Sequence, residues 1–447
     1  MMLPRRFFDC PDVPYLCKAA DTCTEPMAAL FPASRSPRTI LVICTRRIGD
    51  VLLVTPFVRS LKSRWPDAQI DMLVFQGTGG VLENNPDVRR VILVAQRARL
   101  RERLADARKI WRSYDLACAA MTSDRAAFYC WFAGRKRIGI VEPSGKSWFK
   151  RLMFNRLSVD NPASWHTVQS ALSLAPLLGI APCPEVVAPG IGSEVQAVAG
   201  LDRRLAAAEG KPIAVLHPYP MYTYKMWHDE GWLALIDWLH AQGYAVVLTG
   251  GPAEAEVAYA QRIETNAETN SAANAKANAA AKAKADAEIN SQTRTRGVTI
   301  NLAGQLSLGE TAETIRRAQL FVGPDTSVTH IAAATGTPTI ALFGPSNPVR
   351  WGPWPKGWST PTSPWPLVGS GRHGDVYLLQ GTGACVPCKL EGCEAHIGSW
   401  SDCLLMLDAN RVIDAAAELL GIVRQQQVRE AIVSLMPNRP QRRGATS

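Results

Sequence analysis

The sequence "RRIGDVLLVTP" at residues 46–56 lies between the apolar run "TILVIC" and the basic segment "FVRSLKSRW". The apolar run is short and rich in β-branched residues, which is typical of a buried parallel strand. Thr55 followed by Pro56 predicts an N-cap and the first position of a helix. We therefore expect Gly49 and Asp50 in the turn at the carboxyl end of the first strand.

An acidic residue in this turn has two interpretations. Doubly wound α/β folds bind ligands at the carboxyl edge of their sheet, so Asp50 is a candidate base for a substrate hydroxyl. Acidic residues also cap helices, and a capping role for Asp50 needs no ligand. The stretch alone leaves both interpretations open.

Length and charge narrow the possible functions. The chain has 447 residues, of which 47% are hydrophobic, so it is long enough for two domains. Its formal charge of +10 favours acidic partners such as phosphate-bearing substrates or an anionic membrane surface. No nucleic-acid-binding signature is present, so we expect no nucleic-acid partner. No apolar run reaches the roughly 20 residues that span a bilayer, and no signal peptide is evident, so we expect a cytoplasmic protein.

Strand-like and helix-like patterns alternate from residue 39 onward, which predicts an α/β fold with parallel sheets. Two such series predict two Rossmann-like domains that face a central cleft. The expected organisation is a poorly ordered extension (1–37), an N-terminal Rossmann-like domain (38–185), a linker (186–210), a C-terminal Rossmann-like domain (211–425) and a basic tail (426–447).

Residues 266–290 interrupt the second series with "NAETNSAANAKANAAAKAKADAEIN". Alanine and lysine favour helix, but a helix without an apolar stripe has nothing to pack against. This segment is therefore expected to be a surface insertion that is partly helical and mobile. Insertions of this kind cost little stability.

The segment "FVGPDTSVTHIAAATGTPTIALFGPSNPVRWGP" at residues 321–353 predicts a strand, a helix N-terminus and a second strand. Free backbone N–H groups at this helix start, with the hydroxyls of Thr326 and Ser327, would form an anion site that suits a diphosphate. A helix cap alone explains Asp325 and Thr326. His330 lies one helical turn further on, either as a ligand contact or as a structural histidine.

Basic residues are candidates for binding acidic groups in both domains. The loop "HPYPMYTYKMWHDEGW" places Lys225 at the edge of the expected cleft, where a compact cation could hold a phosphate. In the first domain, Arg46, Arg47 and Arg59 could meet an acidic acceptor. The alternative for all four is an ordinary solvated surface.

Four late cysteines, Cys385, Cys388, Cys393 and Cys403, follow a C-x2-C-x4-C-x9-C pattern. Four thiolates suit a structural zinc ion, and a cytosolic location disfavours disulfides. Buried thiols or a redox-labile pair are the alternative.

The order and spacing of these motifs resemble glycosyltransferase family 9, the bacterial heptosyltransferases of the lipopolysaccharide inner core, which have the GT-B fold. The resemblance covers roughly residues 38–425 and rests on "RRIGDVLLVTP", "KMWHDEGW", "LTGGPAE", the segment around "GPDTSVTH" and the late cysteines. It implies inverting transfer of heptose from ADP-heptose to an acidic, lipid-linked core acceptor. It also implies peripheral contact with the cytoplasmic face of the inner membrane.

The resemblance further implies that the N-terminal domain binds the acceptor and the C-terminal domain binds the nucleotide sugar. Asp50 would be the general base, and Glu254 would hold the donor ribose. The donor-binding residues implied by the family motifs are Lys225, Glu254, Asp325, Thr326, Ser327 and His330. The chain has no Asp-x-Asp pair, so we expect no catalytic metal and no required cofactor. The alternatives are a different nucleotide sugar for another surface glycan, or a non-catalytic nucleotide-sugar-binding protein.

Overall fold

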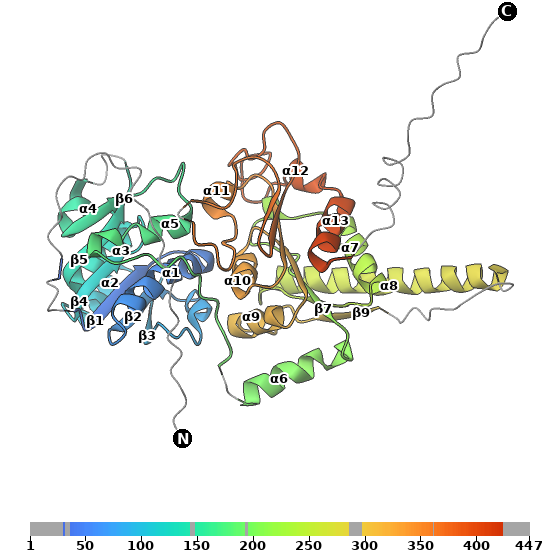
Figure 1. Cartoon of the computed structure of the whole chain (residues 1–447), viewed down its shortest axis with the longest axis horizontal. Helices are drawn as coiled ribbons and strands as arrows, with labels where there is room; N and C mark the ends of the chain where they lie inside the picture. Colours follow the sequence, from blue (N-terminus) through green and yellow to red (C-terminus); the bar gives the residue numbers. More distant parts are fainter. Residues whose placement is uncertain are drawn as a thin grey trace, which may run out of the picture.

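The computed structural model describes residues 30–31, 36–143, 148–192, 195–285, 297–360 and 362–422. They form two α/β bodies side by side, each built around its own sheet (Figure 1). The predicted basic tail lies outside the described residues, as does the predicted N-terminal extension apart from residues 30–31 and 36–37. In the described part of the chain, no helix is both long and apolar enough to cross a membrane.

The N-terminal body contains a six-stranded sheet in the order β3-β2-β1-β4-β5-β6, with all neighbouring strands parallel. Its strands are β1 (Thr39–Cys44), β2 (Gln69–Phe75), β3 (Arg90–Val94), β4 (Tyr114–Ala119), β5 (Gly134–Val141) and β6 (Arg156–Val159). The first strand has the predicted bounds. We did not predict β6, because this short edge strand is only partly buried and contains no apolar run.

Helices cover both faces of this sheet. α1 (Ile48–Arg64) packs against α5 (Thr167–Leu172) on one face. The strand order reverses direction after β3, so right-handed crossovers place α2 (Leu100–Lys109), α3 (Asp124–Ala133) and α4 (Trp148–Met153) on the opposite face. The two helical layers therefore have different neighbours, and α1 and α5 lie in the layer that contacts the second body.

The C-terminal body contains a seven-stranded sheet in the order β12-β13-β11-β10-β7-β8-β9. Its strands are β7 (Ile213–Leu216), β8 (Ala245–Leu248), β9 (Val298–Asn301), β10 (Leu320–Pro324), β11 (Thr339–Phe343), β12 (Gly371–His373) and β13 (Val376–Gln380). Its main helices are α7 (Asp229–Ala241), α8 (Glu254–Ala285), α9 (Leu308–Arg316), α10 (Ser327–Thr335), α11 (Pro348–Trp351) and α13 (Ala409–Leu420). The predicted architecture of two α/β bodies with parallel sheets is confirmed, except at the edge of the second sheet, where β12 pairs antiparallel with β13 and neither strand was predicted.

The start of α1 differs from the prediction. The helix begins at Ile48, so Thr55 and Pro56 lie inside it rather than at its N-cap. Proline has no N–H to donate to the Leu52 carbonyl four residues earlier. The Thr55 hydroxyl donates to that carbonyl instead, at 2.7 Å, so the helix continues through the proline.

The segment that joins the two bodies runs along α1. Val187 donates its N–H to the Thr55 hydroxyl at 2.9 Å, and Cys183 donates its N–H to the Ser60 hydroxyl at 2.7 Å. The predicted linker (186–210) contains the helix α6 (Val195–Leu205).

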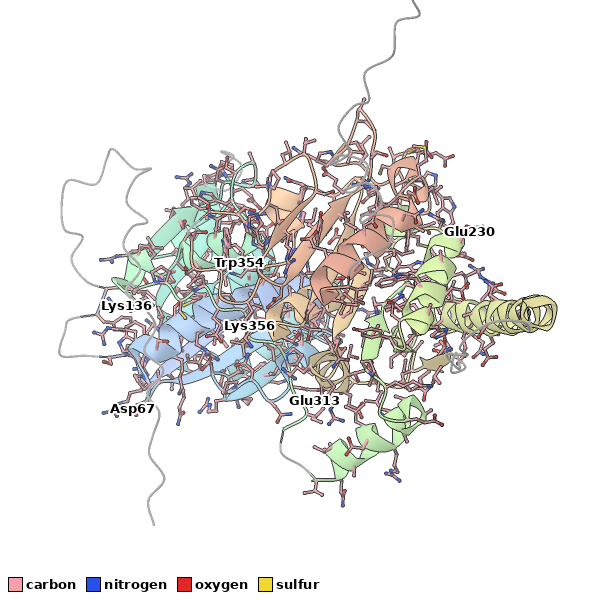
Figure 2. All side chains as sticks on the ribbon, turned by 45° about the vertical axis from the view of Figure 1, so that its right-hand side comes forward. Asp67, Lys136, Glu230, Glu313, Trp354 and Lys356 are labelled. Atoms are coloured by element: carbon pink, nitrogen blue, oxygen red, sulfur yellow. The ribbon has the colours of Figure 1, made fainter. Side chains whose placement is uncertain are left out.

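Charged and polar contacts tie the two bodies together. Arg350 at α11 forms a two-pronged ion pair with the buried carboxylate of Asp160, at 2.8 and 3.2 Å, and donates to the Ser170 hydroxyl at 2.7 Å. His166 donates from Nε2 to the Gly352 carbonyl at 2.7 Å. Trp354 packs on the His166 ring, and Figure 2 shows this tryptophan between the bodies.

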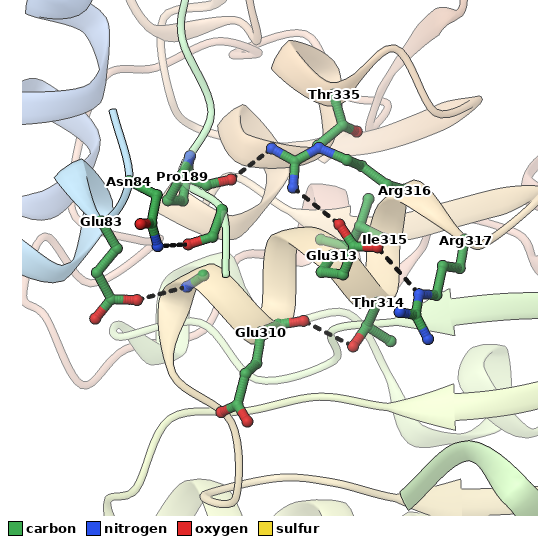
Figure 3. Close-up of polar contacts among 12 residues, drawn as sticks. Glu83, Asn84, Pro189, Glu310, Glu313, Thr314, Ile315, Arg316, Arg317 and Thr335 are labelled. Atoms are coloured by element: carbon green, nitrogen blue, oxygen red, sulfur yellow. Dashed lines mark hydrogen bonds and ion pairs between the residues drawn. The ribbon is translucent and has the colours of Figure 1, made fainter. Parts of the chain in front are cut away.

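A second group of contacts lies around α9 (Figure 3). Glu83 of the N-terminal body accepts the N–H of Gly309 at 3.2 Å, where the positive end of the helix dipole favours a carboxylate. Asn84 donates to the Gly190 carbonyl at 2.8 Å, and Arg316 donates to the Pro189 carbonyl. These contacts connect the first body, the linker and the second body.

The low-complexity segment continues a packed helix. α8 extends away from the C-terminal body (Figure 1) and ends at Ala285. Tyr259, Ile263 and Ala267 are buried at a spacing of four residues, so the packed stripe reaches into the predicted insertion. The helical part of the prediction is confirmed, but the boundary at residue 266 is wrong because Ala267 belongs to the core.

We therefore predict different results for two deletions. Replacing residues 272–290 by a short Gly-Ser connection should leave the melting temperature and the activity close to wild type, since halving a loop changes its closure free energy by only about 0.6 kcal/mol. Deleting residues 266–290 also removes Ala267 and should lower the melting temperature. Thermal unfolding of both purified variants tests this, and equal melting temperatures would contradict the assigned boundary.

Candidate functional site

Two helix N-termini meet where the bodies touch. α1 begins after β1 and α10 begins after β10, and the two helices are in contact. A Cβ added to Gly49 would lie 3.6 Å from Cδ2 of His330 and 3.8 Å from Cα of Ser327, so the first turns of the two helices lie side by side here. The first N–H groups of a helix have no partners within it and carry partial positive charge. This junction is therefore suited to an anionic ligand.

Asp50 lies in the first turn of α1, not in the turn before it. Its carboxylate accepts the N–H of Arg47 at 3.3 Å, so it does cap the helix. Only 8% of Asp50 is exposed, and burial raises the pKa of its carboxyl although Arg46, Arg47 and Arg350 act in the opposite direction. A raised pKa makes a carboxylate a stronger base, so capping does not exclude the base role.

Lys225 is paired with Asp325. The lysine closes the short helix η5 (Thr223–Lys225), and its Nζ lies 2.5 Å from Oδ2 of Asp325 at the end of β10. Burial alone would raise the pKa of Asp325, but the charge and hydrogen bond of Lys225, together with His330 and Ser346, outweigh burial and lower the pKa. Lys225 and Asp325, both predicted to bind the nucleotide sugar, are therefore in contact. The lysine is held by a carboxylate and is not simply solvated.

The predicted anion site at α10 has the expected local structure. Thr326 is the N-cap, and its hydroxyl accepts the N–H of Thr329 at 3.4 Å, while Ser327 is the first helical residue. His330 is buried, and its Nδ1 has no hydrogen-bond partner among the described residues. Burial lowers the pKa of His330 to about 4, so the ring is neutral at pH 7. A neutral imidazole has one donor and one acceptor nitrogen, and Nδ1 is available for a hydrogen bond with a ligand.

The three arginines predicted to bind an acidic acceptor have different surroundings. Arg46 and Arg47 are exposed beside Asp50, and the Arg47 guanidinium lies 5.0 Å from the centre of the Tyr222 ring in the other body. Arg59 lies roughly 14 Å further along α1 and is paired with Asp87 at 2.5 Å and with Glu185, directly before the linker, at 3.1 Å. The structure thus places Arg59 in a structural ion pair, and its predicted acceptor role is not supported.

Of the two acidic residues near the turn after β8, it is not the expected Glu254 but Glu256 that contacts the turn. Glu254 is exposed at the first residue of α8. Two residues later, Glu256 accepts the N–H of Gly251 in the turn that follows β8, at 2.5 Å. Glu256 is thus bound to the glycine turn itself, and the sequence analysis overlooked it because the motif "LTGGPAE" ends before it.

Sequence reasoning also missed Arg350 and His166. Arg350 lowers the pKa of Asp50 electrostatically, and the buried His166 holds the carbonyl of Gly352 directly after α11. Arg350 stands within the motif "NPVRWGP", which was the available signal. Its partner Asp160 is 190 positions away, and no local pattern connects the two.

The four late cysteines line one pocket, together with residues such as Pro345 and Asp402. Cys385 and Cys393 are exposed, Cys388 is intermediate and only Cys403 is buried, so the interpretation as four buried thiols is wrong. Among the described residues, no three His, Cys, Asp or Glu side chains are arranged to hold a metal ion. The structure therefore does not support the predicted zinc site.

Known proteins are similar to this sequence over about two thirds of its length. A model of glycosyltransferase family 9 (heptosyltransferase) matches residues 101–282 and 274–359, and the two stretches meet inside the low-complexity segment. Lipopolysaccharide heptosyltransferase 3 of Escherichia coli is 31% identical over 315 residues, which cover 68% of this chain and 83% of that protein. Lipooligosaccharide heptosyltransferase 2 of Haemophilus influenzae is 25% identical over 321 residues, 69% of this chain and 84% of that protein.

Solved structures agree on the fold. E. coli ADP-heptose lipopolysaccharide heptosyltransferase II aligns with a TM-score of 0.61 and 20% identity over 86% of this chain and 98% of its own. The E. coli heptosyltransferase solved with ADP-2-deoxy-2-fluoro heptose aligns with a TM-score of 0.57 and 19% identity over 85% of this chain and 99% of its own. The predicted GT-B fold is confirmed, and the family match extends over more than half of the sequence. The chain therefore belongs to glycosyltransferase family 9, the heptosyltransferase family, and is a glycosyltransferase.

Proposed function

We propose that this glycosyltransferase moves heptose from ADP-heptose to a hydroxyl of an acidic, lipid-linked lipopolysaccharide core acceptor, with inversion at the anomeric carbon. The observation that carries the proposal is that Gly49, which precedes Asp50 on α1, lies against Ser327 and His330 in the first turn of α10. One body thereby supplies a base and the other supplies a diphosphate site. The relatives are named as heptosyltransferases, which supports heptose as the sugar.

Each charged group has a role in this reaction. Asp50 takes the proton of the acceptor hydroxyl while that oxygen attacks the anomeric carbon from the face opposite the diphosphate. The bond to the diphosphate breaks, and ADP departs with the bonding electrons. The N–H groups at the start of α10 and the ammonium of Lys225 stabilise the negative charge that develops. Arg46 and Arg47 attract the acidic acceptor.

Two alternatives are separated by experiment. The groups at α10 recognise a diphosphate but do not select the sugar attached to it, so another nucleotide sugar would fit the same geometry. A protein that only binds nucleotide sugars would show no turnover with any donor. Mass spectrometry of acceptor incubated with ADP-heptose, and with other ADP-, UDP- and GDP-sugars, decides among the three functions.

We also propose a cytoplasmic protein in peripheral contact with the inner membrane, because a lipid-linked acceptor is presented at a bilayer surface. The acceptor body would be residues 38–185 and the nucleotide-sugar body residues 211–425.

Asp50→Asn should lower the rate of transfer by about 10²–10⁴-fold, because only proton removal is lost. The asparagine oxygen still accepts the Arg47 N–H, so ADP affinity should not change. Burial puts the pKa of Asp50 higher in the folded chain than in the unfolded chain, so ionisation of Asp50 destabilises the fold as pH rises through that pKa. The variant should therefore melt at the wild-type temperature or above it at neutral pH.

The matched control is Glu310→Gln, which alters the equivalent capping carboxylate of α9, where Glu310 accepts the Ser307 N–H at 2.8 Å. This control should retain full activity. Wild-type rate should fall on acidification at a pH above the ordinary pKa of aspartate, because Asp50 must be ionised to act. Near wild-type turnover by Asp50→Asn would disprove the base assignment.

Lys225→Met should weaken ADP binding and also lower the melting temperature, because it leaves the buried Asp325 carboxylate without its partner. Adding Asp325→Asn removes that buried charge and should recover stability without recovering ADP affinity. Calorimetric titration with ADP and thermal unfolding distinguish the two effects. If Lys225→Met binds ADP as tightly as wild type, the lysine has only a structural role.

Transfer should continue in excess chelator, because Lys225 and the α10 terminus would replace a bridging divalent cation and the chain has no Asp-x-Asp pair. Immediate loss of activity that magnesium restores would contradict this mechanism. A slow loss of stability, with one zinc per chain by elemental analysis, would instead establish a structural zinc site at Cys385, Cys388, Cys393 and Cys403.

A further inference from the structure

The outer helical layer of the N-terminal body carries large apolar side chains on its exposed side. This layer consists of α2, α3 and α4 and lies on the sheet face opposite α1 and α5. Its exposed large apolar side chains are Leu100, Trp111, Trp131, Trp148, Phe149 and Leu152. Single exposed apolar residues are ordinary, but several from one layer mark an interaction surface.

Helix α4 has its polar and apolar sides reversed. Trp148 is 67% exposed and Leu152 is 75% exposed, whereas Lys150 between them is only 5% exposed. The Lys150 ammonium points inward to Asp124 at 2.6 Å and to Glu142 at 2.9 Å. A surface helix normally turns its lysine outward and its tryptophan and leucine inward. Here the ion pairs fix the opposite orientation, so α4 presents its apolar side to its surroundings.

The same region holds most of the net charge of the protein. Residues 97–151 contain 14 Lys and Arg and 5 Asp and Glu, a net charge of +9 within a chain total of +10. Exposed members include Arg112, Lys136 and Arg151, and Lys136 lies at the outer side of this body in Figure 2. Tryptophan and other large apolar side chains next to lysine and arginine are the combination that binds anionic lipid surfaces.

The layer also adjoins the edge of the sheet where Asp50 lies. Ser123, the N-cap of α3, shares a hydrogen bond with Thr45 at 3.1 Å, and Thr45 directly follows β1. The next residue, Asp124, holds Lys150 of α4. The starts of α3 and α4 are thus attached to the carboxyl edge of the sheet, close to the proposed base.

We propose that the surface of α2, α3 and α4 docks the enzyme on an anionic phospholipid bilayer. Trp148, Phe149 and Leu152 enter the lipid headgroup region, and the surrounding basic side chains bind lipid phosphates. The inference deepens the proposed function and rests on it in one respect, since a lipid-linked acceptor would reach Asp50 from the bilayer along this edge.

The test is flotation of the full-length protein with vesicles of phosphatidylethanolamine and phosphatidylglycerol. Trp148→Ser/Leu152→Ser should reduce the bound fraction roughly tenfold or more, because two large apolar side chains no longer leave water. Lys150 is unchanged, so the fold should be retained. The matched control is Val368→Ser/Trp400→Ser, which alters two exposed apolar residues of the other body and should bind like wild type.

Binding should weaken with added salt and with vesicles of phosphatidylcholine alone. Transfer to a lipid-embedded acceptor should fall with vesicle binding, whereas transfer to a delipidated acceptor should match wild type. Equal flotation of the two double variants would overturn the proposal. Vesicle binding that does not change with salt would also overturn it. So would self-association of the wild-type protein that is lost in Trp148→Ser/Leu152→Ser, because the apolar surface would then bind a second copy of the chain. Absence of transfer by the wild-type protein to either acceptor would instead refute the proposed function and leave the vesicle result valid.

Discussion

The contact between α1 and α10 at Gly49 is the constraint on which the rest of the structure depends. The first turns of the two helices lie so close here that a Cβ added to Gly49 would be in van der Waals contact with Ser327 and His330. One buried apolar cluster continues through this contact from the first sheet into α9 and α10. The two bodies therefore share part of their core, and their sheet edges meet with both helix N-termini at the same place.

Specific polar pairs hold this arrangement. Arg350 reaches across to Asp160 and Ser170, and His166 reaches back to Gly352. A buried charged or polar group that loses its partner destabilises the fold, because it cannot bond water instead. These pairs therefore favour one relative position of the two bodies. The linker adds a third connection through Thr55 and Ser60 on α1.

Burial acts differently on the two carboxylates of the candidate site. Asp50 has arginines in its vicinity but no direct ion pair among the described residues, and burial raises its pKa. Asp325 is equally buried, yet the ammonium of Lys225 at 2.5 Å lowers its pKa. Asp50 is thus suited to accept a proton and Asp325 to remain charged, although both lie at the same junction. In each case the neighbouring groups set the pKa of the carboxyl.

The sequence by itself determined the features that depend on local patterns. Apolar runs marked the main strands, the Pro-Asp-Thr-Ser motif marked the start of α10, and the ordered motifs identified the family. Tertiary structure decided what depends on distant partners. α1 passes through Pro56 because Thr55 satisfies the Leu52 carbonyl, and Arg59 is occupied by Asp87 and Glu185. The outward face of α4 likewise follows from ion pairs of Lys150 that no periodicity reveals, because hydrophobic patterning records which side chains avoid water but not which charges meet.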